Sequence, residues 1–200
     1  MKHFYPRRCI SFEMDQRAVI EAFDEKALIG RARSGSAEAF GELVRAHQDR
    51  VFGLAWSVLR NGADTEDAAQ EAFLRAFRNL DKLREGAPFG PWIGRIAVNL
   101  ALNAAKSRRR RQIRLSLLES LMPSRTPVDP ETPDFDAAMS ALKPRQRLAL
   151  ELFHRDGLAY EEIAQLMETS VMQVKNHVHR GRKRLKKLLE SEMRSANHGK

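Results

Sequence analysis

The sequence predicts an all-α protein of two small helical domains joined by a flexible linker. Apolar residues recur at steps of three and four over most of the chain, which is the spacing of amphipathic helices. We find no internal repeat and no run of alternating apolar and polar residues, so nothing indicates a strand. Four prolines from Pro123 to Pro133 separate the two helical parts.

Charge and composition narrow the class of partner. The 200 residues carry a formal net charge of +9, which favours nucleic acid or an anionic membrane surface. No run of about 18 apolar residues exists, so we expect no membrane span, and the N-terminus lacks the apolar core of a signal peptide. The single Cys9 cannot form an internal disulfide, and no cysteine and histidine cluster suggests a metal site. We therefore expect a cytoplasmic protein. Residues 1–23 are expected to be a disordered tail, with Met1 or Met14 as the start.

The first domain is predicted over residues 24–111. A short helix ends near Gly35, and Ser36 is a good N-cap for a long amphipathic helix that stops at Asn61-Gly62. Asp64 is the expected N-cap of a third helix. The predicted buried stripe of this third helix consists of Ala69, Phe73, Ala76, Phe77 and Leu80.

The third helix also carries an acidic and amide face with one apolar residue in it. Its members stand at i, i+3, i+4 and i+7 and are Asp67, Gln70, Glu71 and Leu74. A solvated helix start explains this spacing equally well. Asp64, Asp67 and Glu71 also have the helical spacing of a carboxylate metal site, but no second carboxylate helix faces them, so we expect no metal.

A further helix is predicted from Phe89, after a polar loop over residues 81–88. Its inward face holds Trp92, Ile96 and Leu100. Its other face holds Arg95, Asn99, Asn103 and Lys106. The helix runs into Arg108–Arg111, and a run this dense repels itself unless phosphates neutralise it, which favours nucleic acid over plain solvation.

Residues 112–133 are predicted to be the linker, with one short helix around Leu115–Leu121 before the prolines. Fully extended, such a segment reaches at most ~75 Å. This is about two turns of DNA at ~35 Å each. The two domains could therefore hold separate sites on one duplex.

The second domain, residues 134–194, ends in a predicted helix-turn-helix over Leu158–Leu188. Ser170 and Gln173 form a capping-box pair at the start of its second helix. One face of that helix is apolar, and the opposite face carries amide, imidazole and cationic groups. The members of the polar face are Met172, Asn176, His179, Arg180 and Lys183, flanked by Gln173 and Lys175. This suits a helix that reads a major groove, although a solvated basic helix and plain helix packing share the pattern.

Four stretches of the chain, in order, resemble the extracytoplasmic-function (ECF) sigma factors of the sigma-70 family. They are Ala39–Val51, the sequence DTEDAAQEAFL at residues 64–74, FGPWIGRIAVN at residues 89–99, and Leu158–Leu185. Together they cover most of residues 24–190. The resemblance implies a four-helix region 2 domain and a helix-turn-helix region 4 domain, which bind core RNA polymerase and promoter DNA and are expected to be controlled by an anti-sigma factor.

The resemblance also implies residue roles. The docking face on the clamp of the largest polymerase subunit would be Asp67, Gln70, Glu71 and Leu74. The −10 set, which captures a flipped base and contacts the nearby backbone, would be Leu83, Trp92, Ile96, Asn99, Asn103, Lys106, Arg108 and Arg109. The −35 set would be Met172, Gln173, Lys175, Asn176, His179, Arg180 and Lys183. Of the −35 set, Lys175, Asn176, His179 and Arg180 match the contacts of the family's reader.

Departures from the family and rival functions remain. Glu168 stands in the turn where the family usually has glycine, so the turn is expected to differ. Asn176, His177 and His179 replace commoner residues, so the −35 sequence cannot be transferred from a relative. The alternatives are a free-standing helix-turn-helix repressor or activator and a nuclease that uses the Asp64–Glu71 carboxylates. The sequence holds no nucleophile–base pair and no phosphate-binding glycine loop, so we expect no enzyme and no cofactor.

Overall fold

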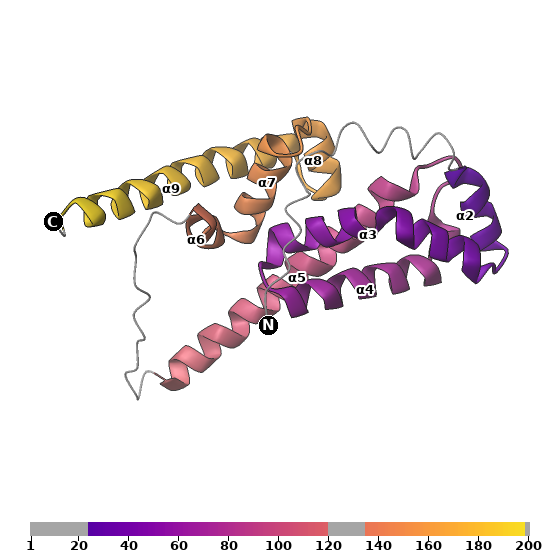
Figure 1. Ribbon diagram of the computed structural model, residues 1–200, viewed down its shortest axis with the longest axis horizontal. Coiled ribbons are helices and arrows are strands. Elements are labelled where there is room, and N and C mark those ends of the chain that lie inside the picture. The colour runs from indigo at the N-terminus through magenta and orange to yellow at the C-terminus, as the bar shows by residue number, and fades with distance from the viewer. Residues whose placement is uncertain (1–23, 120–134, 199–200) are drawn as a thin grey trace.

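A computed structural model describes residues 24–119 and 135–198, and all of its regular elements are helices (Figure 1). The N-terminal domain is built from α2 to α5. Its elements are α2 (Glu25–Arg33), α3 (Ala37–Leu59), α4 (Gly62–Arg78), the 3-10 turn η1 (Leu80–Lys82) and α5 (Phe89–Glu119). The predicted tail over residues 1–23 lies outside the described residues. Within those residues no helix is long and apolar enough for a bilayer crossing.

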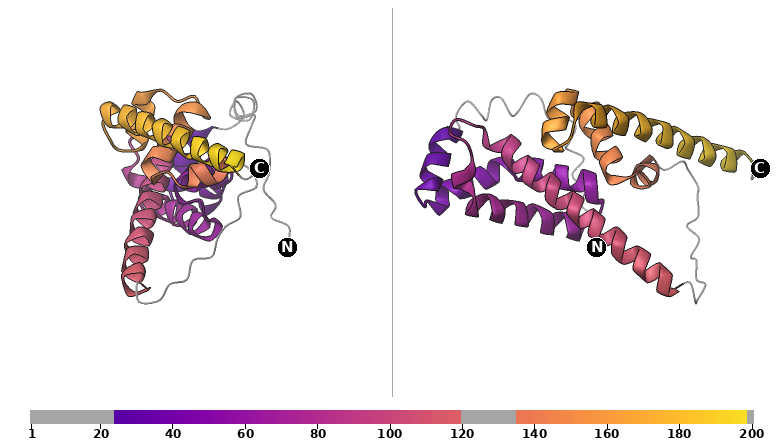
Figure 2. Two further views of the ribbon diagram at one scale, coloured as in Figure 1. Left: turned by 90° about the vertical axis from the view of Figure 1, so that its left-hand side faces the viewer. Right: turned by 180° about the vertical axis from the view of Figure 1, so that it is seen from behind.

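The C-terminal domain is built from four helices. They are α6 (Phe135–Ser140), α7 (Pro144–His154), α8 (Tyr160–Leu166) and α9 (Val171–His198). Helix α9 is long, and its last part projects away from the other helices (Figures 1 and 2). The sequence therefore predicts the fold class correctly, with two small helical domains.

Helix starts follow the sequence signals, with one correction. The side chains of Asp24 and Ser36 accept backbone N–H bonds at the starts of α2 and α3, as Ser36 was expected to do. The N-cap of α4 is Asn61, whose side chain accepts from the N–H of Asp64, so the prediction of Asp64 as the cap is wrong. Arg60 takes the left-handed conformation at the end of α3 (φ 49°), so α4 begins without a loop.

The first hydrophobic cluster lies inside the N-terminal domain, between α2, α3, α4 and α5. Phe89 is among its largest fully buried side chains. Phe77 was predicted to be in this core but is 48% exposed, and its ring packs edge-on against Phe40 at 5.0 Å. Ala76 and Leu80 of the predicted stripe are buried, and Ala69 and Phe73 are half-buried. The other fully buried alanines of α4 are Ala68 and Ala72, which the prediction did not include. These alanines allow α4 to lie close to its neighbours, which leaves Phe77 at the edge.

The second hydrophobic cluster is shared by both domains. It joins Leu54, Val58 and Val98 of the N-terminal domain to residues of α6, α7, α8 and α9. Helix α7 packs on α3, and α8 packs on α5 (Figures 1 and 2). The sequence analysis did not predict this packing between the domains.

The boundary of the linker also differs from the prediction. Helix α5 continues as one α-helix to Glu119, whereas the linker was expected to begin at residue 112. The Arg108–Arg111 run is therefore helical. Residues 120–134, which include the four prolines, lie outside the described residues.

Candidate nucleic-acid and protein interfaces

The docking face of α4 is open to solvent in its larger part. Asp67, Gln70 and Leu74 are exposed, and Glu71 is half-buried. The Glu71 carboxylate accepts a hydrogen bond from Nε of Arg75 at 2.6 Å, so one acidic charge is already paired within the helix. Leu74 is 50% exposed and the neighbouring Phe77 is 48% exposed. A surface that mixes acidic and large apolar side chains suits a protein partner better than DNA.

Asp64, which was weighed as a metal ligand, lies beside a cation. Its carboxylate is 3.3 Å from the guanidinium of Arg108 on α5. Among the described residues, no group of three or more histidine, cysteine, aspartate or glutamate side chains is placed to hold a metal ion.

The −10 set falls into two groups along α5. Trp92, Ile96 and Asn99 are half-buried, and the Trp92 ring lies 5.7 Å from that of Phe89 in the core. The other group is exposed and follows along the same helix, and it consists of Asn103, Lys106, Arg108 and Arg109. One continuous helix thus carries partly buried aromatic and amide groups first and then a line of cations, of the kind that phosphates attract.

Leu83 is the member of the −10 set that the structure places elsewhere. Its side chain is 3% exposed and belongs to the core of the N-terminal domain, so it is not available to a base. The apolar residue closes the core under the loop. Arg33 of α2 also holds the loop, because its guanidinium donates to the carbonyl of Leu80 at 3.1 Å and to that of Leu83. Arg33 was not singled out from the sequence, because an arginine at the end of a helix carries no signal of a distant partner.

The start of α5 is held by a second contact that the sequence analysis missed. The Glu25 carboxylate accepts from the N–H of Phe89 at 3.2 Å and lies 2.9 Å from Nε2 of His47. These bonds lower the pKa of Glu25, chiefly through the hydrogen bond with His47. A carboxylate at a helix N-terminus satisfies a free N–H and faces the positive end of the helix. Glu25 therefore fixes the end of α5 that carries Trp92.

The −35 set shares one exposed face of α9. All of its members are exposed, and Met172 is 66% exposed. Ser170 accepts from the N–H of Gln173 at 3.2 Å, as an N-cap should. The Gln173 side chain accepts from the hydroxyl of Thr169 instead of completing the capping box.

The opposite face of α9 is packed closely against α7. Val174 and Val178 are buried. A Cβ atom on Gly181 would lie 2.7 Å from Cδ1 of Leu150, so only glycine fits without a shift of that leucine. His177, on the flank, is half-buried, and burial together with Arg145 and Arg180 lowers its pKa, which favours the neutral imidazole.

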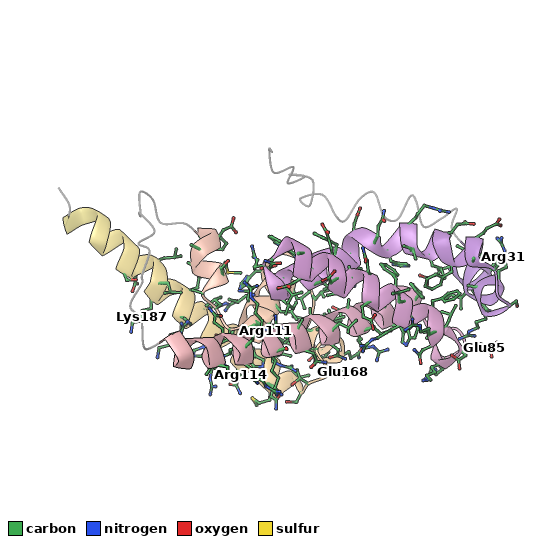
Figure 3. All side chains as sticks on the ribbon, turned by 90° about the horizontal axis from the view of Figure 1, so that it is seen from below. Arg31, Glu85, Arg111, Arg114, Glu168 and Lys187 are labelled. Carbon is green, nitrogen blue, oxygen red and sulfur yellow. The ribbon has the colours of Figure 1, made fainter. Side chains whose placement is uncertain are left out.

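The turn of the helix-turn-helix keeps the left-handed backbone that glycine usually provides. Glu168 has φ 47°, and the N–H of Thr169 donates to the carbonyl of Ala164 at 3.0 Å. This is the bonding of a helix end closed by a left-handed residue. The turn was expected to differ because of Glu168, but it has the left-handed geometry, and the glutamate side chain there has a cost in backbone strain. Figure 3 shows Glu168 at the surface.

Comparison with known proteins matches both halves of the chain. A family model described as Sigma-70 region 2 matches residues 43–111, and one described as Sigma-70, region 4 matches residues 134–185. The chain is 36% identical over 162 residues to the ECF RNA polymerase sigma factor SigE of Mycolicibacterium smegmatis, which covers 76% of this chain and 62% of that protein. It is 30% identical over 180 residues to the ECF RNA polymerase sigma factor SigW of Bacillus subtilis, which covers 82% of this chain and 96% of that protein.

Solved structures agree with these matches. CnrH in complex with the cytosolic domain of CnrY resembles the chain with a TM-score of 0.59 and 26% identity, over 84% of this chain and 97% of CnrH. The chain therefore spans only 62% of the M. smegmatis relative, but nearly the full length of the B. subtilis relative and of CnrH.

Proposed function

The chain belongs to the extracytoplasmic-function sigma factors of the sigma-70 family, and from this we propose that it binds core RNA polymerase and directs it to promoters. It reads a −35 and a −10 element and helps to open the strands at −10. It catalyses no reaction itself and acts in the cytoplasm, where polymerase and DNA are. An anti-sigma factor holds it inactive until a signal releases it.

The observation that carries the proposal is the segregation of two kinds of surface. The docking face on α4 is acidic and apolar, whereas the exposed parts of α5 and α9 are amide-rich and cationic. DNA attracts the second kind and repels the first. A free-standing helix-turn-helix repressor would account for α9 but not for an acidic, apolar face on a chain of net charge +9.

Roles within the −10 set follow from chemistry. A base that leaves the duplex loses its stacking, at a cost of a few kcal/mol, and needs a site that stacks and hydrogen-bonds with it. Trp92 offers an aromatic face, and Asn99 offers both a donor and an acceptor. Lys106, Arg108 and Arg109 then neutralise the backbone beside that site. Leu83 supports the loop from the core and is left out of the contacts.

Run-off transcription with core polymerase tests the function, and a charge reversal tests the docking face. Glu71→Lys should abolish co-purification with core polymerase, because a cation replaces the carboxylate and faces Arg75. Glu66→Lys makes the same charge change on an exposed position of α4 outside the docking face and should leave co-purification intact. Equal binding by both variants, or transcription that does not depend on the chain, would remove the proposal.

A further inference from the structure

Helix α2 contacts both ends of the loop that joins η1 to α5. At the last residue of α2, Arg33 donates to the carbonyls of Leu80 (3.1 Å) and Leu83, where the chain leaves η1. At the first residue of α2, Glu25 accepts from the N–H of Phe89 at 3.2 Å, where α5 begins. The loop between these two contacts is therefore held by a cation and an anion at opposite ends of one nine-residue helix.

The core holds the same two ends of the loop by their side chains. Leu83 is 3% exposed and Phe89 is fully buried, and both belong to the hydrophobic cluster of the N-terminal domain. Most of the loop between them is open to solvent, and its exposed members are Arg84, Glu85, Gly86 and Pro88. The loop thus has fixed ends and an accessible middle.

The middle of the loop is a tight turn. The N–H of Ala87 donates to the carbonyl of Arg84 at 3.0 Å, which closes a four-residue turn. Gly86, the third residue of this turn, has φ 73°, a conformation that glycine adopts without a steric cost. Pro88 follows and restricts the backbone further, because its ring fixes φ. A loop with so little internal freedom takes its position from the places where its ends are held.

Both contacts from α2 reach backbone atoms of the loop and not its side chains. A planar guanidinium can donate to two carbonyls at once, and hydrogen bonds that involve a charged group are stronger than neutral ones. Glu25 is itself oriented by Nε2 of His47 at 2.9 Å, and this hydrogen bond lowers the pKa of the Glu25 carboxyl, which favours the charged form. The fixation therefore does not depend on the residue types within the loop.

The fixed loop lies next to the aromatic side chain of the −10 set. Phe89 stands one helical turn before Trp92, and their rings are 5.7 Å apart. Figure 3 shows Glu85 of the loop at the same end of the N-terminal domain as Arg31 of α2. A base stacked on Trp92 would have this loop beside it, so the position of the loop decides the shape of the space that the base enters.

We propose that Glu25 and Arg33 are positioning residues of the −10 site, which fix the loop over residues 84–88 so that the site prefers one base at one −10 position. The preference rests on the proposed function, whereas the fixation of the loop in the free chain does not. Neither residue contacts DNA in this proposal. Recognition sites need their groups held to within about 0.5 Å, which explains why both ends of a short loop carry a charged contact.

Base preference at the −10 element tests the positioning role. On a promoter that the parental holoenzyme transcribes, each −10 position is replaced by the other three bases, and the transcripts are counted. Good hydrogen bonds to a base favour it over a wrong base by roughly tenfold or more. Arg33→Met has a side chain of similar length without the donors, and should lower this ratio several-fold at one −10 position. The −35 preferences and the affinity for core polymerase should stay at the parental values.

Matched variants separate positioning from general stability. Arg31→Met removes a cation from the same last turn of α2 at an exposed position and should leave the base preference unchanged. Glu25→Ala releases the other end of the loop and should act at the same −10 position as Arg33→Met, with Glu38→Ala in the first turn of α3 as its control. A protein that is only destabilised would transcribe every template less by one factor. Such a uniform loss, or an unchanged preference in both loop variants, would overturn the proposal.

A conservative variant covers a failure of Arg33→Met to fold. Arg33→Lys keeps a charged donor without the planar fork and should lose part of the preference. Hydrogen exchange of the backbone over residues 83–89 in the free chain reports the fixation itself, and should be faster in both Arg33 variants than in Arg31→Met.

The two measurements together distinguish the possible failures. Unchanged exchange would refute the fixation of the loop. Faster exchange with an unchanged base preference would refute the positioning role while the proposed function stands. Faster exchange in a chain that supports no transcription would uphold the fixation but reject the proposed function, and the positioning role with it.

Discussion

The −10 and −35 sets are built in opposite ways. On α5, Trp92, Ile96 and Asn99 are half-buried, and Trp92 and Ile96 pack against the N-terminal core, whereas every member of the −35 set stands on an exposed face of α9. A site that must accept an extruded base needs a shaped wall, and a core provides one. A helix that enters a groove needs only an accessible face. Stability and recognition are therefore coupled in α5 and separable in α9.

The largest expected effect on stability and transcription comes from Trp92→Ala. The ring contributes to the core and to the proposed base site, so the variant should lose about 2–3 kcal/mol of unfolding free energy, less than a fully buried tryptophan would. Transcription should fall at the same time. Urea denaturation and run-off transcription measure both quantities. Full stability with lost transcription would show that the ring serves recognition alone, and would contradict the coupling of stability and recognition in α5.

Arg180→Ala tests the other side of the comparison. Its unfolding free energy should stay within about 0.5 kcal/mol of the parent, because the side chain is exposed. Discrimination between the cognate and a scrambled −35 element should fall by ~1–3 kcal/mol if the guanidinium contacts a base edge. Competition binding of the holoenzyme measures this. An equal loss on both DNAs would mark a phosphate contact instead.

A smaller effect is expected from Glu25→Gln. Because the folded-state pKa of Glu25 is lowered, its carboxylate stabilises the fold at pH values above its ordinary pKa of 4.5, and this contribution disappears as the pH falls through the lower folded-state pKa. The variant should lose about 1 kcal/mol at neutral pH, the usual range for a helix cap, and differ little from the parent in acid. Urea midpoints at the two pH values test this, with Glu85→Gln in an exposed loop as the control.

The smallest expected effect is a gain in unfolding free energy. Glu168→Gly removes the strain of a side chain at positive φ and should raise the unfolding free energy by about 0.5–1 kcal/mol. DNA binding should not change, because Glu168 precedes the reading face. Glu168→Ala keeps a Cβ atom and should gain nothing, so equal thermal midpoints for the two variants would contradict the explanation.

The sequence predicted the helices and their faces well where periodicity and caps carry the signal. It correctly marked Ser36 as a cap, and the polar face of α9 is exposed as expected. It failed where tertiary packing overrides the local pattern. Phe77 fits the helical stripe of α4, yet the alanines beside it decide how α4 packs. Leu83 lies in a loop, where an apolar residue gives no periodic signal of burial.

The contact between the domains could not be predicted for a different reason. Arg147 and Glu151 are charged residues one turn apart, a pattern that normally marks a solvated helix face. Their partners are mostly the backbone carbonyls of α3 and the side chains of Ser57 and Arg60, about 90 residues away. Backbone carbonyls leave no trace in a sequence, so no pattern of residue types points to them.

The uninterrupted length of α5 has a mechanical consequence. At 1.5 Å per residue the helix is about 46 Å long. Its first part packs in the N-terminal domain as far as Arg108, which pairs with Asp64, and its last turns project beyond that domain (Figures 1 and 2). Helix α5 therefore acts as a rigid lever, with the −10 set near the end that is held in the N-terminal domain. If the N-terminal domain tilts by about 10° when it binds the proposed polymerase partner, the tip at Glu119 swings by roughly 8 Å, on the same rise per residue. The chain continues from that tip towards the second domain, so a small tilt at the start of α5 becomes a larger displacement at its end.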